Sequence, residues 1–328
     1  MVIVVSLSVN LIYKKTMSRI LSFVSLTLIF LLTACGQAQS GESQKEMNAS
    51  EIIKLINKGK DVHLNDRIIV DDVDFSSVKD MSVASVGKME SRVGVNIFFS
   101  NCVFLGNVTA IGEYRKLLVY TSFSKNVTFF DCDFRGNLTM NYADVYGTLE
   151  FSRSVFRGET SFNNIYVRGN RFGFLEVEAE RNFSMVDADI RGNANFMNAK
   201  FDSTANFLGM RVNKLQCSNV VFSGNVDFSN SFFNGDVLFN YVEYGANAQF
   251  SFSKYYGNTD FMHSVYTGSV SYERSSFYGG VRWNKSTYTS TVDTKDATFL
   301  SLPDTTGVSL NGKVDIDVAN FIKTNINK

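Results

Sequence analysis

Three groups of closely spaced aspartates are the residues of this sequence most suited to chemistry. They are Asp71, Asp72 and Asp74; Asp131 and Asp133; and Asp187 and Asp189. Paired carboxylates can bind calcium, or act as acid and base in cleaving a sugar polymer. The second and third groups have i, i+2 spacing, which places both carboxylates on one outward face of an extended segment. Solvated carboxylates on a polar face explain the same spacing, and we favour that interpretation over catalysis.

Histidines and cysteines are too few for the common catalytic and metal sites. The only histidines are His63 and His263, and no cluster has the short His or Cys spacing that a zinc site needs. The cysteines are Cys35, Cys102, Cys132 and Cys217. Buried free thiols behave as small hydrophobes, which is our interpretation of the last three. A Cys102–Cys132 disulfide stays open as an alternative, if the two segments are neighbours in an oxidising compartment.

An eleven-residue repeat must position these residues. From Phe123 to Phe299 an apolar side chain returns every eleven residues, apart from irregular steps of 10, 13 and 10 residues that end at Val177, Ile190 and Phe222. A fixed period of this kind is typical of a solenoid, in which each unit buries its apolar face by stacking on its neighbours. If two repeats make one coil, the regular part contains eight coils.

Within one repeat, the spacing predicts short strands joined by corners. With Phe222 as position zero, a small or aliphatic residue follows at plus four and an aromatic at plus six, and these share one face of an extended segment. Gly recurs at plus two and Asn at plus three, as in Gly224 and Asn225. We expect these two residues to supply the left-handed backbone of a sharp corner. The apolar spacing and frequent Gly exclude a helix here.

A family resemblance is carried by two stretches, ADVYGTLEFSRSVFRGETSF at 143–162 and NSFFNGDVLFNYVEYGANAQF at 230–250. They resemble the pentapeptide-repeat proteins, in a variant with an extra residue at every second corner. The resemblance covers roughly residues 96–300 and concerns architecture, not activity. It implies an all-β fold, a right-handed parallel β-helix of roughly square cross-section with Phe side chains stacked along its axis. Four residues depart from the plus-six aromatic: Gly173, Ser218, Thr294 and Thr305. Such departures indicate either looser coils or a register shifted by one residue.

The N-terminal segment resembles a bacterial lipoprotein signal. Arg19 precedes an apolar run from Ile20 to Leu32, and Leu-Thr-Ala-Cys closes it at Cys35. The resemblance implies cleavage before Cys35 and lipid attachment to it, with Met17 as the expected start. A transmembrane anchor is the alternative, but the run is shorter than the roughly 20 residues that span a bilayer. Gly36 replaces the aspartate that favours inner-membrane retention in enterobacterial lipoproteins, so we expect the outer membrane.

These observations divide the chain into five parts. We expect a signal peptide at 1–34, a lipidated tether at 35–48, a cap helix with a first irregular coil at 49–95, the solenoid at 96–300 and a C-terminal cap at 301–328. Ser50 is the predicted helix cap and Gly59 the predicted stop. Residues 76–95 and 110–122 interrupt the period and are predicted to be loops or bulging insertions.

Charge and the lack of a catalytic constellation guide the functional prediction. The chain has 32 basic and 32 acidic residues, and removing Lys14, Lys15 and Arg19 with the leader leaves 29 basic residues, so the mature net charge is near −3. We therefore expect no nucleic-acid partner, and an acidic DNA mimic that binds gyrase is a remote alternative.

The leading hypothesis is a non-enzymatic lipoprotein of the bacterial envelope, anchored to the membrane through Cys35. It would act as a scaffold for an envelope protein or glycan and would need no cofactor. The alternative is a carbohydrate-binding or polysaccharide-degrading β-helix that uses one of the aspartate pairs. A row of outward aromatics could bind glycan or protein, and its candidates are Tyr241, Tyr255 or Tyr256, and Tyr278.

Overall fold

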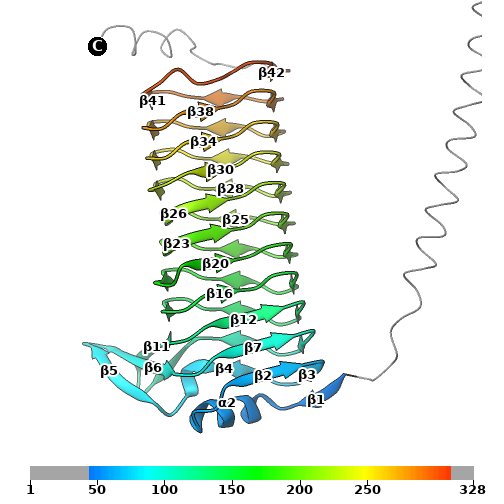
Figure 1. Cartoon of the computed structure of the whole chain (residues 1–328), viewed down its shortest axis with the longest axis vertical. Helices are drawn as coiled ribbons and strands as arrows, with labels where there is room; N and C mark the ends of the chain where they lie inside the picture. The colour runs from blue at the N-terminus through cyan, green and yellow to red at the C-terminus, as the bar shows by residue number, and fades with distance from the viewer. Residues whose placement is uncertain (1–43, 312–328) are drawn as a thin grey trace, which may run out of the picture. The chain divides into compact units, whose positions relative to one another are not determined.

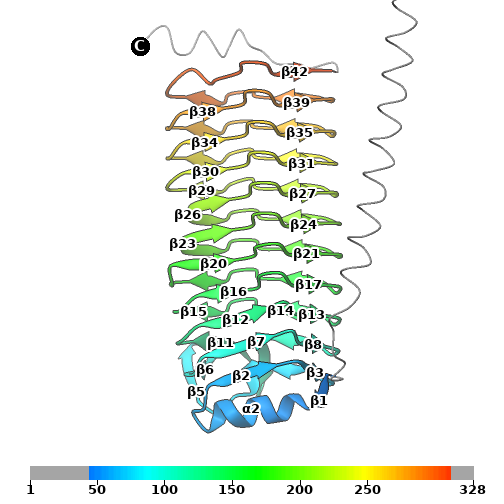
Figure 2. The ribbon, with the colours of Figure 1, turned by 45° about the vertical axis from the view of Figure 1, so that its right-hand side comes forward.

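The structure is a computed structural model that describes residues 44–311, and its compact unit begins at Lys45. This unit is a β-solenoid in which short parallel strands stack in columns, with one α-helix at its N-terminal end (Figures 1 and 2). Each regular coil contributes four strands, one to each of four faces, as β27 to β30 show over residues 221–238. The predicted all-β solenoid is therefore confirmed. Cys35 lies outside the described residues.

The first two faces are separate parallel sheets. Face 1 consists of β1 (Lys45–Met47), β3 (Arg67–Ile69), β8 (Val103–Phe104), β13 (Asp133–Phe134), β17 (Val155–Phe156), β21 (Glu178–Ala179), β24 (Lys200–Phe201), β27 (Val221–Phe222), β31 (Glu243–Tyr244), β35 (Val265–Tyr266), β39 (Thr287–Tyr288) and β42 (Ser309–Leu310). Face 2 consists of β4 (Val73–Asp74), β9 (Val108–Thr109), β14 (Leu138–Thr139), β18 (Thr160–Ser161), β22 (Phe183–Ser184), β25 (Ala205–Asn206), β28 (Val226–Asp227), β32 (Ala248–Gln249), β36 (Val270–Ser271) and β40 (Val292–Asp293).

The other two faces join into one sheet because two long strands, β23 and β26, run through the corner between them. Face 3 consists of β6 (Lys88–Val93), β11 (Leu117–Phe123), β15 (Asp144–Val145), β19 (Tyr166–Val167), the first part of β23 (Asp189–Asn195) and of β26 (Arg211–Gln216), β29 (Phe232–Phe233), β33 (Lys254–Tyr255), β37 (Ser276–Phe277) and β41 (Thr298–Phe299). Face 4 consists of β2 (Val62–Asn65), β7 (Ile97–Ser100), β12 (Val127–Phe130), β16 (Leu149–Glu150), β20 (Arg171–Gly173), the remainder of β23 and β26, β30 (Val237–Leu238), β34 (Thr259–Asp260) and β38 (Val281–Arg282).

Two eleven-residue repeats make one coil, as predicted. Phe134 pairs with Phe156 and Phe222 with Tyr244, and hydrogen bonds between such coils join residues 22 apart in sequence. Twelve strands stack in face 1, because further coils precede the regular ones. Of the two alternatives for the interruptions at 76–95 and 110–122, insertions are correct and loops are not. β5 (Met81–Ser85) and β10 (Ile111–Tyr114) form antiparallel hairpins with β6 and β11, which project from the solenoid (Figure 1).

The core consists of aromatic rings stacked from coil to coil. Phe99, Phe129 and Phe151 are fully buried, and their neighbouring ring centroids are 5.1 Å apart at interplanar angles of 8° and 2°. Such stacks arise because the 22-residue register places the same position of every coil in one column. Each buried ring removes a large apolar area from water, and this burial is the main stabilising contribution of the core.

The corner with Gly at plus two works differently from the prediction. These glycines do not have positive φ; the only described glycines that do are Gly59, Gly87, Gly209 and Gly307. The constraint is space, since a Cβ on Gly224 would lie 2.6 Å from the carbonyl carbon and oxygen of Ser203 in the preceding coil. The Asn at plus three bonds between coils, as when Asn225 Oδ1 accepts from the Asn247 amide at 3.1 Å.

The left-handed residues lie at plus eight, in the other two corners of each coil. Their φ values are between 51° and 60°. Asn and Asp adopt this conformation readily, whereas larger side chains are strained in it. The non-Gly residues concerned are Asn101, Asp131, Tyr142, Arg153, Asn164, Glu176, Asp187, Asn198, Asn219, Asn230, Tyr241, Phe252, His263, Arg274, Lys285 and Asp296.

The irregular steps shift the register by one residue and then restore it. Phe156 pairs with Ala179 and Phe201 with Phe222, and a bulge lies between Ile190 and Asn193. The fully buried side chains of Phe174 and Cys217 therefore occupy the plus-six core positions that the sequence pattern assigned to Gly173 and Ser218. The second explanation offered for these departures, a shift of the register, is the correct one at both positions.

The cap helix is α2 (Ala49–Asn57), followed by the 3-10 helix η1 (Phe75–Ser77) after β4. Buried Ala49, Ile52 and Ile56 pack against the first coil. Ser50 is not the helix cap: Asn48 holds that position, and Asp71 Oδ1 accepts from the Ala49 amide at 2.5 Å. Gly59, with φ 65°, ends the helix as predicted, because its amide and that of Lys60 bond back to the last turn.

The two ends of the solenoid differ from the expected boundaries. At the N-terminal end, β1 pairs with β3 although it lies within the stretch expected to be a tether. At the C-terminal end, β42 is the last described strand, and Leu300, Leu302 and Leu310 are exposed there. The rest of the predicted C-terminal cap, 312–328, lies outside the described residues.

Candidate functional site

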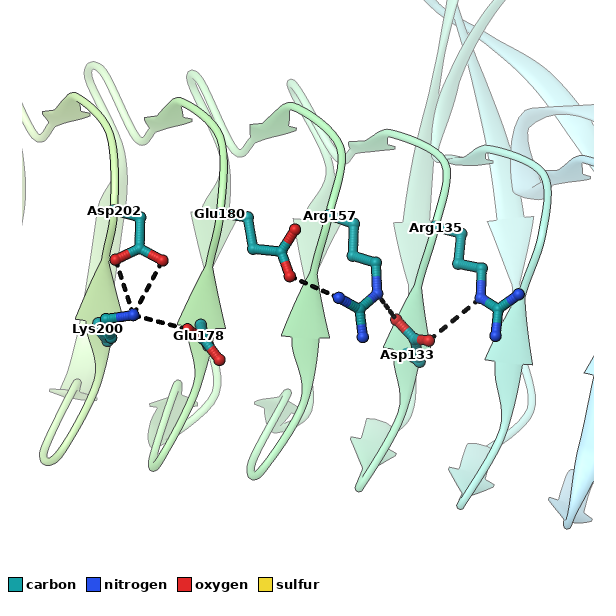
Figure 3. Close-up of polar contacts among 7 residues, drawn as sticks. All are labelled: Asp133, Arg135, Arg157, Glu178, Glu180, Lys200 and Asp202. Carbon is teal, nitrogen blue, oxygen red and sulfur yellow. Dashed lines mark hydrogen bonds and ion pairs between the residues drawn. The ribbon is translucent and has the colours of Figure 1, made fainter.

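Of the Asp131–Asp133 pair, Asp133 belongs to an ion-pair network on face 1 (Figure 3). Asp133 binds Arg135 at 3.2 Å and Arg157 at 2.8 Å, and Arg157 continues to Glu180 at 2.5 Å. The hydrogen bond to Asp133 raises the pKa of Arg157. Asp131 lies in the corner before β13, and its carboxylate is 3.7 Å from the guanidinium of Arg153. These two carboxylates therefore neutralise cations of their own coil and of the next one.

A second group of ion pairs on face 1 is centred on Lys200. Its ammonium lies 2.8 Å from Glu178 and 2.9 Å from Asp202, and both hydrogen bonds raise its pKa (Figure 3). All of these side chains are partly exposed, so each pair contributes little to stability on its own. Their effect is to give face 1 alternating charges that cancel locally.

The other aspartate groups also serve the fold. Asp71 caps α2, Asp72 accepts from the Asn107 amide at 2.7 Å, and Asp74 accepts from the Ser76 amide at 2.9 Å. Asp187 occupies a left-handed corner, whereas Asp189 points outward from β23 on face 3. Among residues 44–311, no group of three or more His, Cys, Asp or Glu side chains is placed to hold a metal ion.

The histidines lie apart and each stacks on an aromatic ring. His63, on β2, has its ring 4.7 Å from Phe98, and His263, in a corner before β35, has its ring 4.7 Å from Tyr241. The structure does not bring them together, which agrees with the interpretation that they are not a catalytic pair.

The three described cysteines are buried free thiols. Cys102 and Cys132 precede β8 and β13, which are adjacent in face 1, so the condition for a disulfide between neighbouring coils is met. Each thiol instead donates to a nearby carbonyl, Cys102 to Ser100 at 3.3 Å and Cys132 to Phe130 at 3.5 Å. Burial raises the pKa of Cys217, which favours the protonated, unreactive form.

Face 3 carries most of the exposed aromatic and cationic contacts of the described residues. We call the outward aromatic and cationic residues of its strands from β15 to β37, and of the positions that directly follow those strands, the cationic–aromatic stripe; they are Tyr146, Tyr166, Arg168, Arg191, Arg211, Phe232, Lys254, Tyr256 and Tyr278. Arg168 lies over the rings of Tyr146 and Tyr166, with its guanidinium carbon 4.8 and 4.3 Å from their centroids. Arg191 also lies over the Tyr166 ring, at 4.8 Å. Further along, Phe232 lies 5.7 Å from Arg211 and 5.4 Å from Lys254.

The predicted row of outward aromatics is confirmed only in part. Tyr256 and Tyr278 are about half exposed and stack at 4.9 Å, with an interplanar angle of 8°. Tyr255 is fully buried in the core, and Tyr241 lies at a different corner, between faces 4 and 1. The sequence reasoning missed the arginines of this row, because their alignment with the tyrosines appears only at the 22-residue spacing of whole coils.

The cations of the stripe are not neutralised in the way that those of face 1 are. Asp144 engages Arg168 through two hydrogen bonds of 2.7 and 2.9 Å. Arg191, Arg211 and Lys254 take part in none of the ion pairs among the described residues. Asp189 adjoins Arg211 by strand register and is the remaining carboxylate of this column. The stripe therefore presents a surplus of positive charge.

No protein-family model and no curated protein matches this chain. The likeness to pentapeptide-repeat proteins consequently remains a resemblance in the repeat pattern. Within residues 44–311, no helix has the length and apolar character needed to cross a membrane.

Proposed function

We propose that the protein is a non-catalytic scaffold, lipid-anchored through Cys35 in the bacterial envelope. The observation that carries this proposal is the combination of a lipoprotein-like signal with a long, uniform solenoid that begins only ten residues after Cys35. Solenoids commonly act through extended, rigid binding surfaces. Here the lipid would hold one end of such a surface close to the membrane.

The engagement of the carboxylates supports the non-catalytic part of the proposal. Asp133 is shared between two arginines, and Asp71 and Asp74 cap helices. A glycosidase needs two carboxylates that face one substrate bond across a cleft. The alternating charges of face 1 also lack the continuous negative surface that a DNA mimic needs.

Fatty-acid labelling of bacterial cells that express the full chain tests the anchor. We expect the wild-type protein and the matched variant Ser40→Ala to incorporate the label and to sediment with membranes. Cys35→Ser should lose both properties, since it lacks the thiol to which the lipid is attached. Labelling and membrane association of Cys35→Ser equal to those of the wild type would refute the anchor.

A further inference from the structure

We propose that the cationic–aromatic stripe of face 3 binds an acidic polysaccharide, laid along the solenoid axis. This inference deepens the proposed scaffold function by naming the chemistry of its partner. It rests on the scaffold proposal but not on the lipid anchor, so the two can fail independently.

The first argument is the state of the cations. Arg191, Arg211 and Lys254 have aromatic rings beside them and no carboxylate in an ion pair among the described residues. A guanidinium that stacks on a ring uses its flat face and leaves its N–H groups free at the edge. Those N–H groups can donate two parallel hydrogen bonds to a carboxylate or phosphate. The stripe is therefore a row of positioned anion donors.

The second argument is the length and spacing of the row. From Tyr146 to Tyr278 the stripe crosses the strands β15, β19, β23, β26, β29, β33 and β37 in one column of parallel pairings. At about 4.8 Å per coil this is roughly 29 Å of uninterrupted surface. One sugar ring of an extended β-linked chain advances by a similar distance, so successive sugars can meet successive coils.

The third argument separates a polysaccharide from single-stranded nucleic acid. Proteins bind unpaired bases by offering them exposed aromatic faces. In the stripe, some ring faces are already occupied: Tyr256 stacks on Tyr278, and Phe232 has a cation on either side in its column. The half-exposed tyrosines also carry phenol hydroxyls, which suit the hydroxyls and carboxylates of a sugar chain better than they suit a base.

Binding of β-linked oligomannuronates of increasing length to the detergent-purified full chain tests the proposal by calorimetry. The comparison probes are a neutral β-linked mannose oligosaccharide and oligothymidylate of equal length. We expect affinity to rise with length up to about six sugars, to fall as salt is added, and to exceed that for both comparison probes. Equal or tighter binding of oligothymidylate, or no binding of the acidic sugar, overturns the proposal.

Two sets of variants locate the site. The triple variant Arg191→Gln, Arg211→Gln, Lys254→Gln should lower the affinity at least about tenfold, since three partly exposed charge contacts are lost together. The charge-matched control on other surfaces, Arg181→Gln, Lys285→Gln and Lys60→Gln, should leave it within about twofold.

The second set removes hydroxyls and keeps the rings. Tyr256→Phe with Tyr278→Phe should weaken binding while the aromatic stack remains. Thermal unfolding checks that every variant is folded. If the triple variant and its control lose affinity equally, the attraction is general and the proposed site is wrong.

Discussion

Replacing Gly224 by alanine is the sharpest test of how the coils fit together. The new Cβ would lie 2.6 Å from the carbonyl of Ser203 and 2.9 Å from the amide nitrogen of Thr204, both backbone atoms of the preceding coil. An ordinary Cβ contact is at least 3.4 Å, so the two corners must separate by somewhat less than 1 Å. No side chain can move aside to prevent this.

The separation weakens the hydrogen bonds that tie this corner to the coil before it. These are the Ser223 amide to the Phe201 carbonyl at 2.8 Å and the Ala205 amide to the Asn225 carbonyl at 2.9 Å. Losing the net contribution of two hydrogen bonds costs about 1–3 kcal/mol. Alanine also restricts the unfolded chain more than glycine does, and this lower entropy of the unfolded state offsets about 0.4–1 kcal/mol of the cost. We expect a net loss of about 1 kcal/mol in the free energy of unfolding.

Urea unfolding followed by the fluorescence of Trp283, the single tryptophan, measures this loss. Gly94→Ala is the matched control, because Gly94 also lies in a corner, has no positive φ, and its Cβ would meet nothing within 4 Å. That variant should be neutral or slightly stabilised. If Gly224→Ala unfolds at the same urea concentration as Gly94→Ala, the close approach of the coils is not the reason for glycine at plus two.

Three further predictions follow from the corners and the core. Glu176→Gly should raise the free energy of unfolding by up to about 1 kcal/mol, because glycine adopts the left-handed backbone of this corner without strain. Glu243→Gly, in a strand, should lower it by a similar amount, and chemical denaturation measures both changes. Burial raises the pKa of five core tyrosines above that of unfolded tyrosine. Because the folded state then keeps protons that the unfolded state releases, the free energy of unfolding should fall as the pH rises above about 10. Tyrosinate absorbance should then show a late, cooperative step on unfolding, and its early appearance in the folded protein would contradict the burial of Tyr244, Tyr255, Tyr266, Tyr272 and Tyr288. A maleimide should label no described cysteine of the reduced, folded protein within minutes at pH 8, and should label Cys102, Cys132 and Cys217 once urea unfolds it; mass spectrometry reads both states.

The columns of the core could be predicted because they depend on one property only, apolarity at a fixed period. Phe222 and Tyr244 are recognisable as members of one column without any knowledge of the coil. The left-handed corner was also present in the sequence, since Asn recurs at plus eight, as at Asn198 and Asn230. It was overlooked because the Gly-Asn pair at plus two and three is a stronger turn signal, although that pair serves close packing and bonds between coils.

The hairpins and the stripe could not be predicted, for different reasons. In the hairpins, β6 pairs directly and in parallel with β11 of the next coil, Val93 with Phe123, and no local pattern encodes such a long-range pairing. In the stripe, Arg211, Phe232 and Lys254 have no common residue type. They become one surface only when every second repeat is aligned, and the irregular step before Phe222 shifts that alignment by one residue.

A comparison of faces 1 and 3 explains how a surplus of charge can persist on a parallel stack. Neighbouring positions of a column lie about 4.8 Å apart, so two cations in succession would repel strongly. Face 1 avoids this repulsion by interposing carboxylates, as Asp133 does between Arg135 and Arg157. In one column of face 3 a ring is interposed instead, since Phe232 separates Arg211 from Lys254 by two coils. In the adjacent column Arg168 and Arg191 do follow one another, but Asp144 pairs with Arg168 and the Tyr166 ring contacts both arginines. The distance between Arg211 and Lys254, about 10 Å, is close to the Debye length at 0.1 M salt, so solvent ions screen the repulsion. The ring attracts both cations without cancelling their charge, which leaves the charge available to an external anion.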